Sequence, residues 1–329
     1  MNPLLEKADT SDGVVSLAQL LQDRPTPKPC LLEPGLLPHQ GILFVGGEPK
    51  VGKSLLVANL ALTLASGGSK AGFDVSNPCR VLLCQFELPL EQFASRLIHM
   101  RQPLGSTADN RLLVDTQSQG HLLNTSKGLN HFLAAARAAK AQVIVLDPLY
   151  STHDQDENDT RSMAALCQTL LRLREASKAS LIVVHHVRKS INRNEIGTAF
   201  RGSSALHAVG DSYVLLTRHL QRRNTIELRF QFRYAAAQQP KLLCLDTRTL
   251  WFEPADNEPP PEPTSRHKVA PSDIQRCFPQ QGQPLRFNQL RHQIMTRSQC
   301  SKRTAQLAIK RACEKGVLVR DQGQYRLPL

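Results

Sequence analysis

Residues 46–54 have the residue types and spacing of a loop that binds phosphate groups. Gly47, Gly52, Lys53 and Ser54 match the pattern G-x-x-x-x-G-K-[ST]. Glycines allow backbone N–H groups to surround the phosphates, the lysine reaches the β and γ oxygens, and the Ser54 hydroxyl ligates Mg²⁺. The predicted nucleotide-binding residues are Gly47, Pro49, Val51, Gly52, Lys53, Ser54 and Leu55. The pattern therefore predicts binding of ATP with Mg²⁺, because an accidental lysine in a glycine-rich turn would lack the flanking apolar runs.

Three further side chains stand at the ends of apolar runs. Asp147 follows four apolar residues and is the expected second Mg²⁺ ligand beside Ser54, although aspartates also cap turns after strands. Glu87 is the candidate that orients the attacking water, with a helix-capping glutamate as the alternative. His186 is the candidate that senses the γ-phosphate, with a buried structural histidine as the alternative. All three are predicted catalytic residues, and adjacent His185 is expected to point to the opposite face of the strand.

These side chains need a sheet whose strand ends meet at one edge. Apolar runs at 42–45, 81–86, 112–114, 143–146 and 181–184 alternate with helical patterns at 53–66, 90–101, 128–140 and 161–176. That alternation predicts a parallel α/β sheet with its ligands at the strand C-termini. The runs 212–217, 225–234 and 241–245 are expected to form hairpins that extend the sheet.

Composition and charge exclude several classes of protein. No apolar run is long enough to span a bilayer, so we expect a cytoplasmic protein without a membrane partner. The eight cysteines include no C-x-x-C pair, which gives no support to a zinc site or a disulfide framework. Of the net charge of +13, most comes from residues 265–329, where thirteen Lys and Arg residues stand against three acidic residues. A basic unit of this kind favours a polyanionic partner such as DNA.

The basic segment follows a proline-rich and acidic stretch at 254–264, which is expected to be an extended linker. We therefore predict an N-terminal arm at 1–29, a core domain at 30–253 and a C-terminal domain at 265–329.

Residues 271–329 have the pattern of a small winged helix-turn-helix domain. The expected order is a helix at 271–277, a strand at 284–287, helices at 287–295 and 301–315, and a hairpin around the turn at 321–324. Ala305, Ile309 and Cys313, with Leu307 and Ala312 nearby, are expected to form the apolar stripe of the third helix. The predicted DNA-binding residues are Lys302, Arg303, Gln306, Lys310, Arg311 and Arg320, with Arg326 as a further wing residue. Protein contacts are the alternative use of such a domain.

Together these motifs resemble a known family. The similar segments are the P-loop, QFELPLEQFASRL around Glu87, VIVLDPLYSTHDQDEND at 143–159, LIVVHHVRKS at 181–190 and FRGSSALHAVGDSYVLL at 200–216. They resemble the RecA-type hexameric ATPases of the plasmid RepA helicase group and, more distantly, DnaB helicases and KaiC, over residues 30–253. The resemblance implies a RecA-like P-loop NTPase core, a ring (a hexamer) with ATP sites shared between subunits, Glu87 as water-activating glutamate and His186 as phosphate sensor.

The arginine finger of the resembled helicases does not carry over to this chain. The matching position is Asp211, so Arg201, Arg222 or Arg223 is left as the candidate, each equally plausible as a surface or DNA-contacting residue.

These motifs are compatible with three functions. The leading hypothesis is a hexameric, ATP-hydrolysing DNA helicase or motor that serves replication of a mobile element. The alternatives are an ATP-switched DNA-binding regulator or helicase loader, and a KaiC-like signalling ATPase whose C-terminal domain binds protein.

Overall fold

The chain divides into two compact units, Met1–Asn257 and Glu258–Leu329, which are described separately. The structure is a computed structural model. It describes residues 14–23, 26, 28–187, 196, 199–200, 203–255, 269–278, 283–298, 300, 302–321 and 323–328, with the backbone alone at 203, 204 and 271. Most of the expected linker and most of the N-terminal arm fall outside these residues, so the proposed functional domain limits stay predictions.

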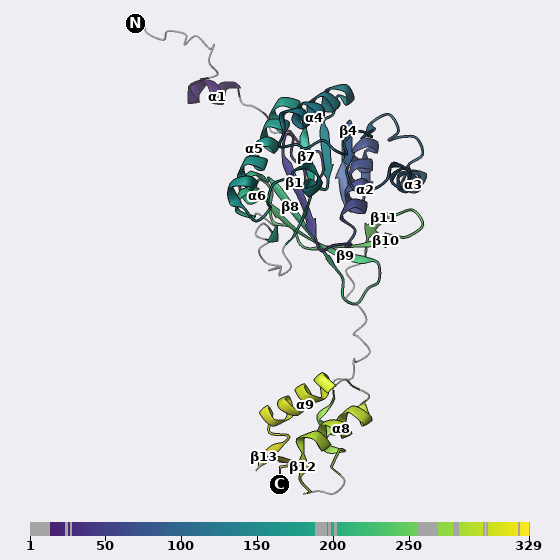
Figure 1. The fold of residues 1–329 in the computed structure, drawn as a ribbon, viewed down its shortest axis with the longest axis vertical. Coiled ribbons are helices and arrows are strands. Elements are labelled where there is room, and N and C mark those ends of the chain that lie inside the picture. Colours follow the sequence, from purple (N-terminus) through teal and green to yellow (C-terminus); the bar gives the residue numbers. More distant parts are fainter. Residues whose placement is uncertain are drawn as a thin grey trace. The chain divides into compact units, whose positions relative to one another are not determined.

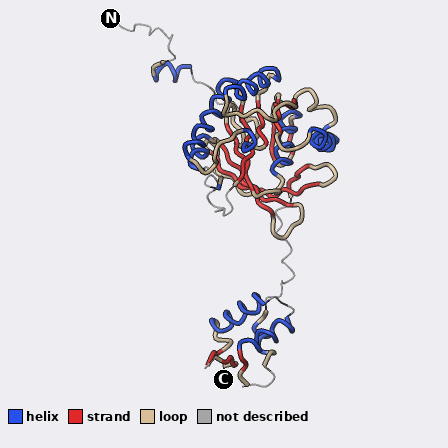
Figure 2. The backbone as a smooth tube through the Cα atoms, viewed as in Figure 1, coloured by secondary structure: helices blue, strands red, loops and turns tan. Residues whose placement is uncertain are grey.

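A nine-stranded sheet forms the centre of the first unit, in the order β11-β10-β9-β8-β1-β7-β6-β4-β5. Its strands are β1 (Ile42–Gly47), β4 (Val81–Gln85), β5 (Leu112–Asp115), β6 (Val143–Asp147), β7 (Ser180–His186), β8 (Ser212–Arg218), β9 (Thr225–Phe232), β10 (Lys241–Asp246) and β11 (Trp251–Pro254). Strands β1 and β4 to β8 pair in parallel, whereas β9 to β11 pair antiparallel. Figure 2 shows the strands gathered between helices, which accounts for the unbroken apolar runs of β1, β4 and β6.

Helices cover both faces of this sheet (Figure 1). Helices α2 (Lys53–Ser66) and α3 (Leu90–Arg101) lie on one face, and α4 (Ser126–Ala139), α5 (Thr160–Ser177) and α6 (Ser203–Val209) lie on the other. Each face has its own buried apolar cluster. Side-chain caps fix two of the helix starts, since Thr125 accepts from Gly128 N at 3.1 Å and Asp159 accepts from Ser162 N at 2.8 Å.

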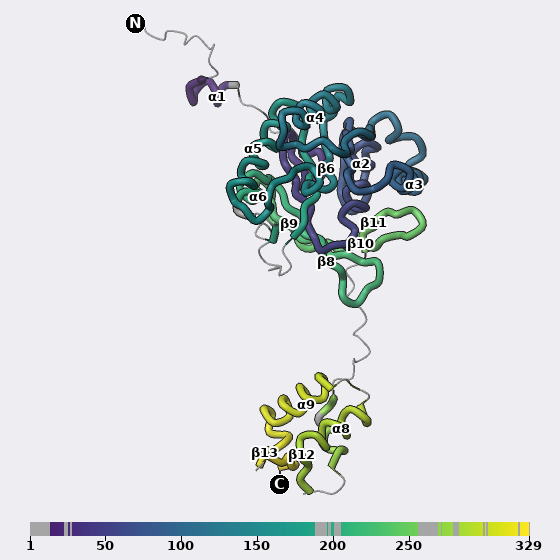
Figure 3. Tube along the Cα trace, in the orientation of Figure 1, coloured from purple at the N-terminus to yellow at the C-terminus, as the bar shows by residue number. Residues whose placement is uncertain are grey.

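The expected α/β fold with a mostly parallel sheet is confirmed, and β8 to β10 extend the sheet as predicted. Figure 3 colours the chain by sequence and shows the later strands β8 to β11 in green. In the sheet they lie in order on one side of β1. The sequence analysis missed α1 (Leu17–Asp23), α6, the small hairpin of β2 (Gly68–Lys70) and β3 (Phe73–Val75), and the edge strand β11. None of the described helices combines the length and apolar character needed to cross a membrane.

The second unit contains α7 (Pro271–Gln275), β12 (Leu285–Arg286), α8 (Phe287–Ser298), α9 (Lys302–Glu314), β13 (Val319–Asp321) and β14 (Gln324–Arg326). Its strands form a sheet in the order β12-β14-β13. Ala305, Ile309 and Ala312 pack into the core of this unit, as the apolar stripe of α9 predicts. Leu307 was wrongly placed near that stripe: it is 45% exposed, because its position on the helix lies among the polar residues of α9.

Candidate functional site

The edge of the sheet where the parallel strands end brings the predicted site residues together. In the sheet register Gly47 pairs with His186, and Gln85 pairs with Asp147. The P-loop, the end of β4, the end of β6 and the end of β7 therefore meet at this edge. Parallel α/β sheets bind their ligands at such an edge.

Glycine is required at two positions of the P-loop. A Cβ on Gly47 would lie 2.6 Å from the Leu216 carbonyl oxygen. Gly52 has φ of 106°, a left-handed conformation that side chains disfavour, and its Cβ would lie 3.0 Å from the Phe252 ring. Gly52 also precedes α2 without a side-chain cap. The first N–H groups of α2 are thus left for an anion, which the positive end of the helix dipole also favours.

Lys53 lies inside the loop rather than in solvent. Its Nζ donates to the carbonyl oxygens of Gly47 and Glu48, each at 3.0 Å, and the residue is only 8% exposed. Burial lowers the pKa of Lys53, while the carboxylates of Asp147 and Glu87 oppose that effect. The ammonium group is therefore held at the phosphate loop by partners that a phosphate oxygen can replace.

Ser54 and Asp147 form the direct link between the P-loop and β6. The Ser54 Oγ donates to Asp147 Oδ1 at 3.0 Å, and Asp147 is 4% exposed. Burial raises the pKa of Asp147 to about 6, against the lowering effect of the Ser54 hydrogen bond. A hydroxyl and a carboxylate side by side are oxygen ligands of the kind that Mg²⁺ prefers. The described residues contain no cluster of three or more His, Cys, Asp or Glu side chains suited to a metal.

Glu87 and His186 are connected through a residue that the sequence analysis did not single out. The Tyr150 hydroxyl donates to Glu87 Oε1, and the Tyr150 ring centroid lies 4.9 Å from that of His186. Glu87 itself is exposed. His185 is fully buried, with Nδ1 3.7 Å from Glu157 Oε1, so the two neighbouring histidines do point to different environments. The signals available for Tyr150 were its place three residues after Asp147 and within the segment 143–159.

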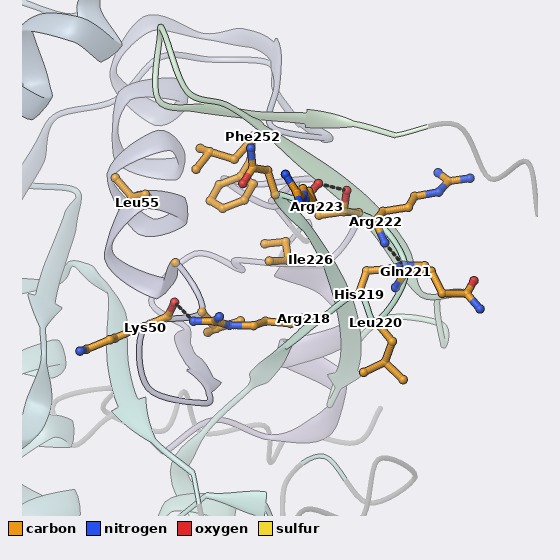
Figure 4. A pocket seen from close by; sticks show the side chains of 15 residues that line it. Lys50, Leu55, Arg218, His219, Leu220, Gln221, Arg222, Arg223, Ile226 and Phe252 are labelled. Carbon is orange, nitrogen blue, oxygen red and sulfur yellow. Dashed lines mark hydrogen bonds between the residues drawn. The ribbon is translucent and has the colours of Figure 1, made fainter. Parts of the chain in front are cut away.

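The candidate arginines fall in different places. Arg201 lies outside the described residues. Arg222 and Arg223 lie on the turn between β8 and β9 and line a pocket of about 580 Å³ beside the chain's own P-loop. Figure 4 shows this pocket, with Arg218 bonded to the Lys50 carbonyl oxygen at 2.5 Å and Phe252 lying across from it. Pro49 does not line this pocket, whereas Val51 and Leu55 do.

Asp211, which occupies the finger position of the resembled helicases, has structural partners here. Its Oδ2 accepts from Ile42 N at 2.9 Å, and its Oδ1 lies 3.3 Å from Arg233 Nη1. Asp211 is 4% exposed, whereas the Arg233 side chain is 42% exposed. Asp211 therefore fixes the start of β1 through Ile42. It also pairs with Arg233, which was not among the arginines proposed from the sequence.

The predicted DNA-binding residues are exposed in the second unit. Those on α9 are Lys302, Arg303, Gln306, Lys310 and Arg311, and those on the hairpin are Arg320 and Arg326. Lys310 lies 3.9 Å from Glu314, and the Arg320 guanidinium lies 5.9 Å from the centre of the Tyr325 ring. The stripe of buried residues on α9 thus leaves Lys302, Arg303, Lys310 and Arg311 exposed to solvent, with Leu307 and Glu314 also exposed on this helix.

A family model described as an AAA domain matches residues 6–191, which is more than half of the chain. No curated protein matched the sequence. Among solved structures, a KaiC-like protein from the archaeon Pyrococcus horikoshii is 11% identical with a TM-score of 0.50, covering 71% of this chain and 99% of its own. A second solved structure, of an ATPase domain, is 11% identical with a TM-score of 0.51, covering 76% and 100%. A DnaB-like replicative helicase is 13% identical with a TM-score of 0.50, covering 66% and 58%. At such identities the similarity is one of fold.

Proposed function

We propose that this chain, which belongs to the family of AAA domains, is an oligomeric, ATP-hydrolysing DNA motor of the RepA helicase type. Its first unit has the RecA-like P-loop fold. The observation that carries the proposal is the hydrogen bond between Ser54 and Asp147 at the edge where Glu87 also lies. The basic C-terminal unit supports DNA as the object of the hydrolysis. Service to a mobile element such as a plasmid remains part of the same proposal.

The nucleotide phosphates bind to the P-loop in this proposal. The N–H groups at the start of α2 and the Lys53 ammonium bind the phosphate oxygens, after Lys53 exchanges its two carbonyl partners for them. Ser54 and Asp147 would hold Mg²⁺, and the ion would supply positive charge beside the transferred phosphoryl group. Asp147 must be ionised to do so, and its pKa of about 6 means that metal binding would compete with protonation below about pH 6.

The pocket next to the P-loop accepts the base and sugar of the nucleotide. It contacts Gly52 and Leu55 at the start of α2 and has Ile226 and Phe252 as apolar walls. Its volume of about 580 Å³ lies within the range of small-molecule sites. Arg223 lies at its rim near Phe252 (Figure 4), so Arg222 and Arg223 serve the nucleotide of their own subunit.

Hydrolysis requires a water in line with the γ-phosphate. Glu87, at the end of the strand beside β6, orients this water and accepts its proton. His186, at the end of the strand beside β1, contacts the γ-phosphate and transmits its presence to the rest of β7.

A neighbouring subunit supplies the remaining positive charge. Strand β9 runs antiparallel to β8, so its end at Phe232 pairs with Ser212 at the edge of the sheet opposite the P-loop. Arg233 follows there, partly exposed and unable to reach its own P-loop. We therefore assign the intersubunit arginine to Arg233, in place of the turn residues beside the pocket.

Mixing two inactive chains tests this assignment. Arg233→Ala lacks the arginine and Lys53→Met lacks the phosphate-binding lysine. Mixed rings regain hydrolysis if an intact P-loop receives Arg233 from the neighbour. Mixtures that stay inactive, although each variant assembles, contradict the assignment.

The second unit tethers the motor to DNA. Its order of helix, strand, two helices and hairpin supports a winged helix, with α9 as the recognition helix. Arg303 and Gln306 are suited to base edges, and Lys302, Lys310 and Arg311 are suited to phosphates.

Single-turnover strand displacement on a forked duplex tests the motor. The full chain should separate the strands with ATP, whereas the matched Glu87→Gln chain should bind ATP and DNA without separating them. A chain that assembles and hydrolyses ATP yet never displaces a strand contradicts the proposal.

One observation favours a second function. Asp211 occupies the finger position of the resembled helicases and is committed to Ile42 and Arg233, which fits a protein whose hydrolysis resets an assembly rather than drives movement. Such an ATP-switched DNA-binding regulator or loader binds a specific duplex in response to ATP and does not translocate. Footprinting with and without ATP separates the two functions.

A further inference from the structure

Tyr150 lies at the predicted catalytic edge, within the segment 143–159, and has no role in the proposed function. It is part of the short helix η3 (Leu149–Thr152), which follows directly after Asp147 and Pro148. Its hydroxyl donates to Glu87 Oε1, and its ring is tilted 37° against the ring of His186. Tyr150, which follows β6, thus contacts Glu87 after β4 and His186 at the end of β7.

We propose that Tyr150 is the positioning residue for Glu87: its hydroxyl holds one carboxylate oxygen so that the other faces the attacking water. The proposal rests on the proposed function, in which Glu87 activates that water.

Glu87 needs such a restraint because of where it stands. It comes after the last residue of β4 and is exposed, so the sheet does not fix its rotamer. A free glutamate side chain loses rotamer entropy when it is ordered. The bond to Tyr150 supplies this ordering before the nucleotide binds, which is preorganisation of a catalytic group.

Tyr150 is itself held well enough to act as a support. Its ring contacts His186, and the backbone of η3 is anchored by Leu123 N, which donates to the Thr152 carbonyl oxygen at 2.6 Å. The hydrogen bond to Glu87 raises the pKa of Tyr150 above its ordinary value. The hydroxyl therefore keeps its proton, and its donor role, throughout the physiological range.

Tyr150→Phe removes the donor and retains the ring. Because Tyr150 is 39% exposed, the lost hydroxyl leaves no internal cavity, and the thermal midpoint should not change. We expect kcat for ATP hydrolysis by the full chain to fall about tenfold with KM for ATP unchanged, since orientation and not binding is lost. Thr169→Val is the control, because it also removes one hydroxyl, whose bond is to the Ala165 carbonyl oxygen within α5, and it should leave kcat unchanged.

Adding the same change to Glu87→Gln separates the inference from the function on which it rests. Glu87→Gln alone should lower kcat by about 100-fold or more, and Tyr150→Phe should then have no further effect. If Glu87→Gln is inactive but Tyr150→Phe keeps or exceeds the parent kcat, the inference fails and the proposed function stands. A further loss in the double variant also overturns the inference, because Tyr150 would then act independently of Glu87. If Glu87→Gln hydrolyses ATP normally, the proposed role of Glu87 fails and the inference fails with it.

Discussion

Asp147→Asn should make the metal-free protein more stable while removing its activity. Asp147 is buried and its carboxylate accepts one side-chain hydrogen bond, from Ser54. Asparagine has nearly the same shape, and its Oδ1 can accept the same bond. The substitution therefore removes a buried charge without removing packing.

The size and sign of the effect come from the raised pKa of Asp147. Between its ordinary value near 4 and its folded value of about 6, the folded protein keeps a proton that the unfolded chain has lost. Folding stability therefore falls as pH rises through this window, and the difference corresponds to about 3 kcal/mol above it. Asparagine does not ionise, so the variant should gain about 3 kcal/mol over the parent at pH 8 and almost nothing near pH 4.

Urea denaturation in the presence of a chelator, at a series of pH values, measures this difference in the first unit. Asp159→Asn is a control of opposite sign, because hydrogen bonds to Ser162 lower the pKa of Asp159, whose charge stabilises the fold above that pKa. Its stability deficit should vanish as pH falls. A stability gain for Asp147→Asn that is absent at pH 8, or equal at pH 4 and pH 8, would show that the Asp147 carboxyl is not destabilised by its burial.

The remaining predictions concern the P-loop and the basic helix. Gly52→Ala should lower the free energy of unfolding by about 1–3 kcal/mol in thermal denaturation, because the left-handed backbone is kept under strain. Lys53→Met should lose binding of a fluorescent ATP analogue, because the phosphate-binding ammonium is removed. The thermal midpoint should stay the same, because burial already disfavours the charged form of Lys53 in the folded protein. Unchanged binding would exclude Lys53 from the phosphate site. Arg303→Ala should weaken DNA binding and reduce discrimination between sequences, because Arg303 is assigned to base edges. Lys310→Ala should weaken DNA binding and reduce the slope of log affinity against log salt by about 0.9, because a phosphate contact is lost. Arg276→Ala, which lies outside α9, should change neither quantity.

Much of the site could be predicted because its signals are local in sequence. The P-loop lies within nine consecutive residues, and the apolar run before Asp147 predicts both a buried strand and its end at the ligand edge. The parallel order then brings Asp147 to Ser54. Each step follows from residue periodicity and from the rule that parallel strands end at one edge.

The parts that could not be predicted depend on contacts between distant segments. Phe252 reaches the pocket from the edge strand β11, about 200 residues after Gly52, and no local pattern gives that pairing. The bond from Tyr150 to Glu87 depends on how η3 turns after β6. Leu307 has the residue type of a core position, but the helical period places it on the exposed face of α9. For Leu307 the helical period was therefore a better guide to burial than residue type, whereas the contacts of Phe252 and Tyr150 depend on the tertiary fold.

The most direct test of the central claim is ATP hydrolysis by the full chain with and without DNA, beside Glu87→Gln. We expect DNA to stimulate hydrolysis by the parent chain, and we expect the Glu87→Gln chain to bind ATP as tightly as the parent but to hydrolyse it at least about 100-fold more slowly. Equal hydrolysis by both chains, or hydrolysis that DNA does not affect, would contradict it.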